Sequence, residues 1–266
     1  SLSIAILNGG RCAAGEQKTA LIVGLLTALI CSVLVSGSVA LLMLRQDRSR
    51  AEDRISNIVL AAGFEKSDVH TMFEDFKPVL ITMVDGSYTA ADNPEAWNDN
   101  FSLMLRDSQA VTPISKSDDI ASLGVLPKQM LAYILYTDEK PSIAVFHIYG
   151  SGLWSVMQGY LAVHIDTQTV AGIKFFEHGE TPGLGGEIDN PLWQAKWQGK
   201  EIYDDDGKVV FTFSRTPVQP DSSEAAYSVD GLSGATLTTD GLKNVINFWM
   251  GPQGYQTFLN KIRGEL

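Results

Sequence analysis

Cysteine and histidine are scarce in this sequence of 266 residues, and their scarcity excludes several kinds of site. There are two cysteines, Cys12 and Cys31, and both lie before or within a long uncharged segment near the start of the chain. The remaining residues therefore cannot form a disulfide framework, nor an iron–sulfur cluster, which needs about four thiolate or imidazole ligands. With four histidines and no H-E-x-x-H sequence, a catalytic zinc site has almost no ligands either.

Basic residues are also few in the large C-terminal part of the chain. Residues 46–266 contain 17 Lys and Arg against 30 Asp and Glu. Such an acidic surface repels phosphate backbones and anionic lipid headgroups. The composition therefore argues against nucleic acid as a partner.

The common nucleotide-binding and hydrolase motifs are absent. Gly183 and Gly185 begin a G-x-G-x-x-G sequence, but Ile188 stands in place of the third glycine, and there is no Walker sequence. Residues 231–235 differ at one position from the G-x-S-x-G nucleophile elbow. In hydrolases with that elbow the catalytic histidine follows the serine, whereas no histidine follows His178. A triad of this order is excluded, and neither a dinucleotide fold nor an NTPase is supported.

The most prominent feature that is present is a run of 26 uncharged residues, Thr19–Leu44, rich in Leu, Val, Ile and Ala. A helix of this length reaches about 39 Å, enough to cross the roughly 30 Å hydrocarbon core of a bilayer with some tilt. The run is much longer than the roughly 7–15 apolar residues of a cleaved signal peptide. We therefore interpret it as an uncleaved anchor, and expect a flexible tail at 1–18 and a transmembrane helix at 19–44.

A stalk helix is expected at 45–65, where Ile55, Ile58, Val59 and Ala62 share one helical face and Gly63 can end the helix. The charges beside the anchor bear on its orientation. Two basic residues precede the run, whereas four follow it: Arg45, Arg48, Arg50 and Arg54. Taken alone, the positive-inside rule predicts that the large domain lies in the cytoplasm.

Residues 66–266 read as one α+β domain with antiparallel strands and hairpins. After a strand at 79–84 and a loop-rich stretch at 85–128, strand signals follow one another closely. We expect strands at 131–136, 143–149, 160–165 and 170–176, and a hairpin formed by 201–203 and 209–213. The acidic residues Asp204–Asp206 at that hairpin are better explained by turn chemistry than by a cation site. Strands with scattered helices indicate a mixed α+β fold.

The last clear element is an amphipathic helix. Leu242, Val245, Ile246, Trp249 and Met250 lie on one helical face. Thr239 or Asp240 can cap its start, and Gly251 with Pro252 can end it.

Three stretches are richer in glycine, threonine and aromatic residues than packing requires: 149–157, 178–187 and 230–239. In the third, glycines allow a sharp turn, threonines present hydroxyls, and the following helix points its unpaired N–H groups at them. This arrangement suits an anion such as phosphate. The alternative is an ordinary turn with an N-cap threonine, and spacing alone leaves both open.

Residues 230–236, Asp-Gly-Leu-Ser-Gly-Ala-Thr, resemble the flavinylation motif D-x-x-(S/T)-(G/A)-A-T of proteins that carry FMN through a threonine phosphoester. With the stretches 148–157, 178–185 and 197–200 and the single N-terminal span, the chain resembles the C subunit of the bacterial sodium-translocating NADH:quinone reductase. The motif alone would also suit the related G subunit of the Rnf complex. The resemblance implies that 66–266 is an FMN-binding domain.

The resemblance implies an electron-carrier subunit with one covalent FMN, in a six-subunit complex that oxidises NADH, reduces ubiquinone and exports sodium. A flavin transferase would attach the flavin, membrane lipid would surround the anchor, and the large domain would face the periplasm from the bacterial inner membrane. That orientation conflicts with the arginine count. A contrasting hypothesis is an anchored extracytoplasmic binding module or scaffold without flavin.

The resemblance also implies roles for single residues. Thr236 would be the FMN acceptor, with Ser233, Gly234, Ala235 and Thr238 beside it. Gly183 and Gly185 would let the backbone approach the isoalloxazine ring, while Leu153, Trp154 and Leu184 cover its faces. For Leu153 and Trp154, simple core packing is an equal alternative. Glu180 and Thr181 would hydrogen-bond the ring or its ribityl chain, with a structural cap as the other possibility. No residue is expected to bind a metal.

Overall fold

A computed structural model describes the backbone of residues 2–265, and the side chains of 19–39, 49–67 and 69–265. The chain divides into two compact units, Ser1–Glu52 and Asp53–Leu266. Helix α1 (Leu2–Ala61) forms the first unit and continues into the second. The flexible tail expected at 1–18 is thus helical from Leu2, since the sequence has no proline before Pro78 to interrupt a helix.

Within α1, Thr19–Val39 is the one stretch among the described residues that is long and apolar enough to cross a membrane. Its side chains are exposed to the surroundings, including Leu21, Leu25 and Leu34. This stretch lies inside the span expected at 19–44.

The second unit is built on a six-stranded sheet in the order β2-β1-β5-β6-β7-β8, with every neighbouring pair antiparallel. Its strands are β1 (Phe76–Thr82), β2 (Tyr88–Ala90), β5 (Gln129–Thr137), β6 (Lys140–Ser151), β7 (Val156–His164) and β8 (Val170–Glu177). Each of the four strands expected between residues 131 and 176 corresponds to one of β5–β8, although β7 begins at Val156 and ends at His164, whereas a strand at 160–165 was expected. The α+β fold with antiparallel strands is therefore confirmed.

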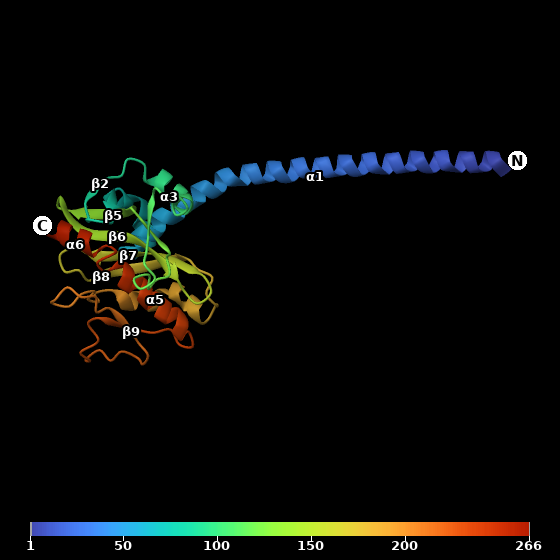
Figure 1. Ribbon diagram of the computed structural model, residues 1–266. Helices are drawn as coiled ribbons and strands as arrows, with labels where there is room; N and C mark the ends of the chain where they lie inside the picture. The colour runs from blue at the N-terminus through green and yellow to red at the C-terminus, as the bar shows by residue number, and fades with distance from the viewer. Residues whose placement is uncertain (1, 266) are drawn as a thin grey trace. The chain divides into compact units, whose positions relative to one another are not determined.

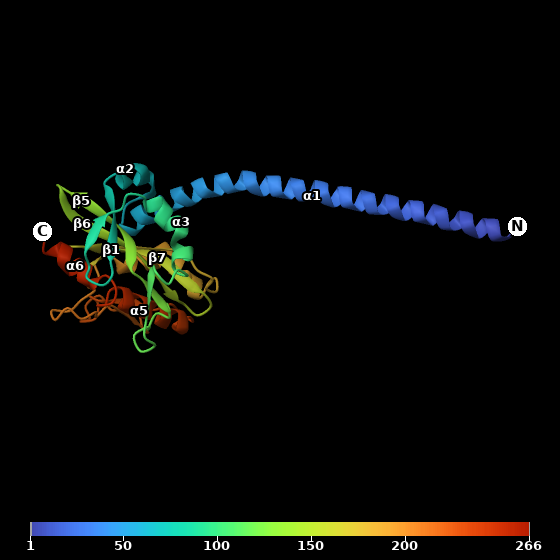
Figure 2. The same ribbon diagram turned by 45° about the horizontal axis from the view of Figure 1, so that its top comes forward.

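The remaining elements surround this sheet (Figures 1 and 2). They are η1 (Lys66–Asp68), α2 (Val69–Phe73), α3 (Pro94–Met104), β3 (Val111–Pro113), β4 (Val125–Pro127), η2 (Gly185–Asp189), α4 (Pro191–Gln194), η3 (Ala195–Trp197), β9 (Thr212–Ser214), β10 (Ser228–Asp230), α5 (Thr236–Trp249) and α6 (Gln256–Arg263).

The two faces of the sheet carry two separate cores. Helices α5 and α6 cover one face, and the end of α1 covers the other together with α2 and α3 (Figures 1 and 2). Alternate residues of β5 serve the two cores, so that Ala132 and Ile134 face α5 and α6 while Tyr133 faces α1. Because both faces are covered, the central strands are buried almost throughout.

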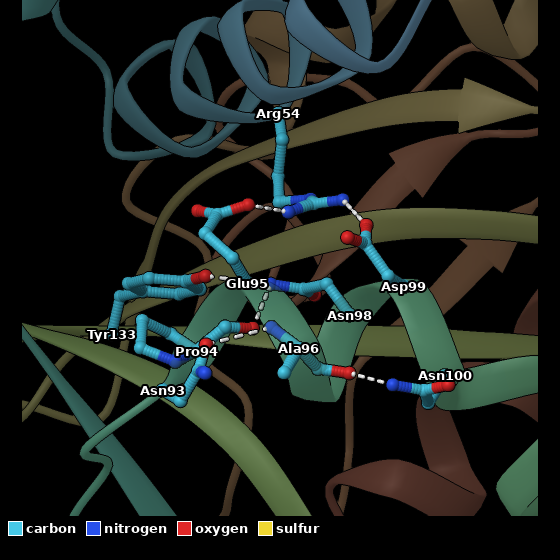
Figure 3. A network of polar contacts seen from close by, with 9 residues as sticks. All are labelled: Arg54, Asn93, Pro94, Glu95, Ala96, Asn98, Asp99, Asn100 and Tyr133. Atoms are coloured by element: carbon cyan, nitrogen blue, oxygen red, sulfur yellow. Dashed lines mark hydrogen bonds and ion pairs between the residues drawn. The ribbon is translucent and has the colours of Figure 1, made fainter. Parts of the chain in front are cut away.

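The end of α1 belongs to the folded domain and is not a separate stalk. Ile58 and Val59 are fully buried. Arg54 pairs with Glu95 and Asp99 of α3, and Asn98 of the same helix donates to the Tyr133 hydroxyl at 3.0 Å (Figure 3). The compact unit therefore begins at Asp53, before the boundary expected at residue 65.

The hairpin expected at 201–213 forms only in part. Tyr203 and Val209 are bridged in antiparallel fashion around the turn at Asp204–Gly207. Strand β9, however, pairs with β10 in parallel, and this pairing carries the chain toward the start of α5.

Candidate functional site

The stretch 230–239 connects β10 to α5. Helix α5 begins at Thr236, earlier than the caps expected at Thr239 or Asp240. The N-cap residue is Ala235, and no side chain among the described residues caps the helix. The hydroxyl of Thr239 instead donates to the Ala235 carbonyl at 3.0 Å and accepts from the Leu232 amide at 3.1 Å. The ordinary N-cap threonine is therefore not what the structure contains, and the first N–H groups of α5 have no side-chain partner.

Asp230 anchors the turn to the rest of the domain. Its carboxylate accepts from the Lys196 ammonium and, at 2.6 Å, from the Val218 amide, while its carbonyl accepts from the Trp193 indole at 2.8 Å. Burial raises the pKa of Asp230, but the hydrogen bonds from Lys196 and Val218 outweigh it and hold the pKa below its ordinary value. The ionised side chain thus fixes the end of β10.

Four hydroxyl side chains lie at this turn, and the structure separates them into two pairs. Thr238 is buried and donates to Glu180 at 2.6 Å, and Thr239 is bonded as described above. Ser233 and Thr236 are exposed, and their hydroxyls form no hydrogen bond with any residue that the structure describes. These two hydroxyls are therefore the ones available to an incoming group.

A pocket of about 710 Å³ opens beside the start of α5. Of the expected site residues, Ser233, Gly234 and Thr236 line it. Three basic side chains also line the pocket: Lys196, Arg215 and Lys243. The sequence did not single them out, because they come from separate segments of the chain. Three acidic side chains, Glu187, Asp230 and Asp240, line the pocket as well, so it carries charges of both signs. The free N–H groups at the start of α5 suit an anion.

The stretches 152–155 and 178–187 adjoin the same end of α5. Glu180 accepts from the Trp154 amide at 2.9 Å, as well as from Thr238. Leu184 packs on the 230–236 turn, since a Cβ on Gly234 would lie 3.0 Å from its Cδ2 atom. The three stretches therefore meet in space, as a common site requires.

The glycines and Thr181 shape the 178–187 loop. Gly183 has φ +74°, a left-handed conformation that favours glycine. Gly185 is buried against Thr238, so its missing side chain makes room within the protein. The carbonyl of Thr181 accepts from the amides of Leu184 and Gly186 and closes the turn, while its side chain is exposed.

Large apolar side chains stand exposed around the meeting point. Leu153 and Trp154 are 42% and 71% exposed, so simple core packing does not account for them. Leu184 and Leu237, from the other two stretches, are 43% and 62% exposed. Exposed apolar groups gathered in one place indicate a binding surface. The described residues contain no group of three or more potential metal ligands.

Comparison with known proteins places this site in a family. Residues 152–251 match the FMN-binding domain model, and this range contains all the expected site residues. The chain is 34% identical to the C subunit of the Na(+)-translocating NADH-quinone reductase of Pseudomonas aeruginosa, over 94% of this chain and 98% of the relative. It is 37% identical to the C subunit of the same enzyme from Yersinia pestis, over 92% of each chain.

Solved structures agree with the sequence relatives. The crystal structure of Shewanella oneidensis NqrC matches with a TM-score of 0.73 and 29% identity, covering 81% of this chain and 99% of that one. The C subunit from Parabacteroides distasonis matches with a TM-score of 0.56 and 25% identity, covering 80% and 94%. The chain therefore belongs to the NqrC family, the C subunits of Na(+)-translocating NADH-quinone reductases, and its pocket lies in an FMN-binding domain.

Proposed function

We propose that this chain is the FMN-carrying electron-transfer subunit of a Na(+)-translocating NADH-quinone reductase, and that FMN is attached covalently through a phosphoester at Thr236. One observation carries the attachment site. Ser233 and Thr236 are both exposed, form no hydrogen bond with the described residues and line the pocket, and the resemblance of 230–236 to the flavinylation motif selects Thr236 of the two. An ester retains the cofactor without any further binding energy, which suits a protein that only carries electrons.

The residues present fit the phosphate end of FMN. A phosphate esterified at Thr236 would lie at the start of a 14-residue helix, where free N–H groups and the helix dipole favour negative charge. Ser233 would offer a hydroxyl beside it, while Gly234, at φ +71°, and Ala235 shape the turn. Arg215 and Lys243 line the same pocket and complement the charge.

The exposed apolar residues fit the other end of the cofactor. Leu153, Trp154 and Leu184 would cover the isoalloxazine faces, since aromatic and aliphatic side chains bind flat apolar rings. When bound, FMN supplies reversible one- and two-electron redox chemistry. The protein would hold the ring at the rim of the pocket, where exposure allows electron exchange with neighbouring subunits.

The other reactions of the complex belong to other chains. No pattern in this sequence indicates binding of NADH, quinone or sodium. We therefore infer that those sites lie on partners within a six-subunit assembly, and that a separate flavin transferase attaches FMN. An Rnf-type complex is not favoured, because the relatives named above are subunits of the quinone reductase.

We further propose that Thr19–Val39 anchors the chain in lipid at the bacterial inner membrane, with the large domain in the periplasm. The arginine count favours the opposite orientation. However, Arg54 is paired with Glu95 and Asp99 inside the folded domain. Its charge is compensated there, so we do not count Arg54 among the basic residues that flank the anchor. Protease treatment of spheroplasts tests the assignment: digestion of the domain supports a periplasmic location, and protection would overturn it.

Flavin attachment is tested on a denaturing gel, with the chain co-expressed with its flavin transferase and illuminated in the ultraviolet. We expect a fluorescent band that survives denaturation and is lost in Thr236→Leu. Thr216→Leu is the matched control, because it makes the same change in the same pocket. Ser233→Ala keeps the acceptor hydroxyl and should retain some flavin.

Two results would contradict the proposal. A dark wild-type band would favour the flavin-free binding module instead. Loss of fluorescence in Ser233→Ala as complete as in Thr236→Leu would show that Thr236 is not the sole acceptor.

A further inference from the structure

The Glu180 carboxylate connects all three stretches of the site. Its residue is only 4% exposed. One carboxylate oxygen accepts from the Thr238 hydroxyl of α5 at 2.6 Å. The other accepts from the amides of Trp154 at 2.9 Å and Ser155 at 3.4 Å. The Glu180 side chain therefore connects the 178–187 loop both to the first turn of α5 and to the turn that carries Trp154.

Two glycines, Gly152 and Gly185, lie close against this carboxylate. A Cβ on Gly152 would lie 2.5 Å from Oε1 of Glu180. A Cβ on Gly185 would lie 3.0 Å from Oε2 and 2.6 Å from the Thr238 hydroxyl oxygen. Neither glycine is in a left-handed conformation, so their role here is to leave room. The two glycines therefore leave the space that the Glu180 carboxylate occupies.

Glu180 is ionised in this setting. Burial raises its pKa, but the hydrogen bonds from Thr238 and from the amides of the 153–155 turn outweigh burial and hold the pKa below its ordinary value. A negative charge beside the first turn of α5 is also stabilised by the positive end of the helix. The charge therefore persists at neutral pH, bonded to a residue two positions along the helix from Thr236.

We propose that Glu180 is a positioning residue for the flavin: its carboxylate fixes the Leu153–Trp154 turn against the first turn of α5. The apolar side chains of that turn then stand in one place beside the Thr236 hydroxyl. This inference rests on the proposed function, since it assigns the fixed turn to the ring of FMN. It leaves Glu180 no direct part in binding the ring, because the residue is only 4% exposed and both of its carboxylate oxygens accept from protein donors.

Glu180→Gln tests the inference, because glutamine keeps the shape but presents an N–H₂ group to one set of donors. Glu177→Gln is the matched control, since Glu177 is exposed, lies outside the pocket lining, and among the described residues its carboxylate accepts only from the Gln158 side chain. The first measurement is hydrogen–deuterium exchange of residues 152–156 in the full chain in detergent, carrying Thr236→Leu so that no flavin is present. We expect exchange at the Trp154 and Ser155 amides to rise at least tenfold in Glu180→Gln and to be unchanged in Glu177→Gln.

The second measurement uses the chain with Thr236 intact and loaded with flavin. We expect Glu180→Gln to retain covalent flavin but to lower its fluorescence anisotropy and shift its visible absorption, with Glu177→Gln matching the wild type. If Glu180→Gln fails to fold, Thr238→Val removes one donor and keeps the carboxylate, and a smaller change of the same sign is expected. Unchanged exchange, or faster exchange with a wild-type flavin spectrum, would overturn the inference. Failure of the proposed function itself would show separately, as a wild-type chain without flavin.

Discussion

Gly241 holds α5 close to the end of β6, and Gly241→Ala tests how much that close approach matters. A Cβ at this position would lie 2.6 Å from the Ser151 carbonyl oxygen and 3.3 Å from the Gly152 Cα atom. Ordinary contact begins near 3.4 Å, so α5 would have to move by about 0.8 Å. Alanine favours a helix over glycine by about 1 kcal/mol, whereas overpacking against rigid backbone costs about 1–3 kcal/mol. We therefore expect a net loss of about 1 kcal/mol.

Thermal unfolding of the full chain in detergent measures this effect. For a domain of this size the loss corresponds to a decrease in Tm of about 2–4 °C. Asn244→Ala is the control, because Asn244 is exposed on the same helix and alanine there gains helix propensity without a clash. Since Ser151 and Gly152 precede the turn that carries Trp154, flavin attachment in Gly241→Ala should also slow. A Tm that rises as in Asn244→Ala would refute the argument from close approach.

Two further predictions concern the buried His147 of β6 and the ion pairs of Arg54. Burial lowers the pKa of His147 from 6.5 to about 4, so the unfolded chain binds a proton between these pH values and the folded chain does not. The free energy of unfolding should fall by about 3 kcal/mol as pH drops from 6.5 to 4, and His147→Phe should remove this slope while the exposed His70→Gln keeps it. An unchanged slope in His147→Phe would contradict the assignment. Arg54→Met should cost less than about 1 kcal/mol in urea unfolding, because Glu95 and Asp99 are 51% and 67% exposed even when paired with Arg54, so water can solvate both carboxylates once the arginine is removed. A loss beyond about 2 kcal/mol would show that this pairing supports more of the fold than exposure suggests.

Most of the sheet was predictable because strand signals are local. Apolar runs separated by short turns located β5 to β8, and the turn at Asp204–Gly207 was also found. The parallel pairing of β9 with β10 was not, since it joins segments separated by the long loop at 215–227. The start of α5 was placed too late because threonine and glycine are weak helix formers, whereas packing against β6 and β9 stabilises the first turn.

The site was predictable in its parts but not in its connections. The motif at 230–236 pointed to Thr236, and the matching FMN-binding domain covers that residue. The basic residues Arg215 and Lys243 gave no local signal, because they become neighbours only in the pocket. Whether Trp154 was core or surface also depended on where its turn lies between β6 and β7.

By itself, the sequence determined an apolar segment long enough to cross a membrane, an α+β domain and a stretch suited to phosphate. Each of these depends on residues close together along the chain, where periodicity and turn chemistry act. The tertiary structure alone decided which hydroxyls are free at the start of α5, and that Glu180 bonds to Thr238 across 58 residues. A hydroxyl is free or occupied according to its neighbours in space, and only the packing of α5 against the sheet and the 178–187 loop supplies those neighbours.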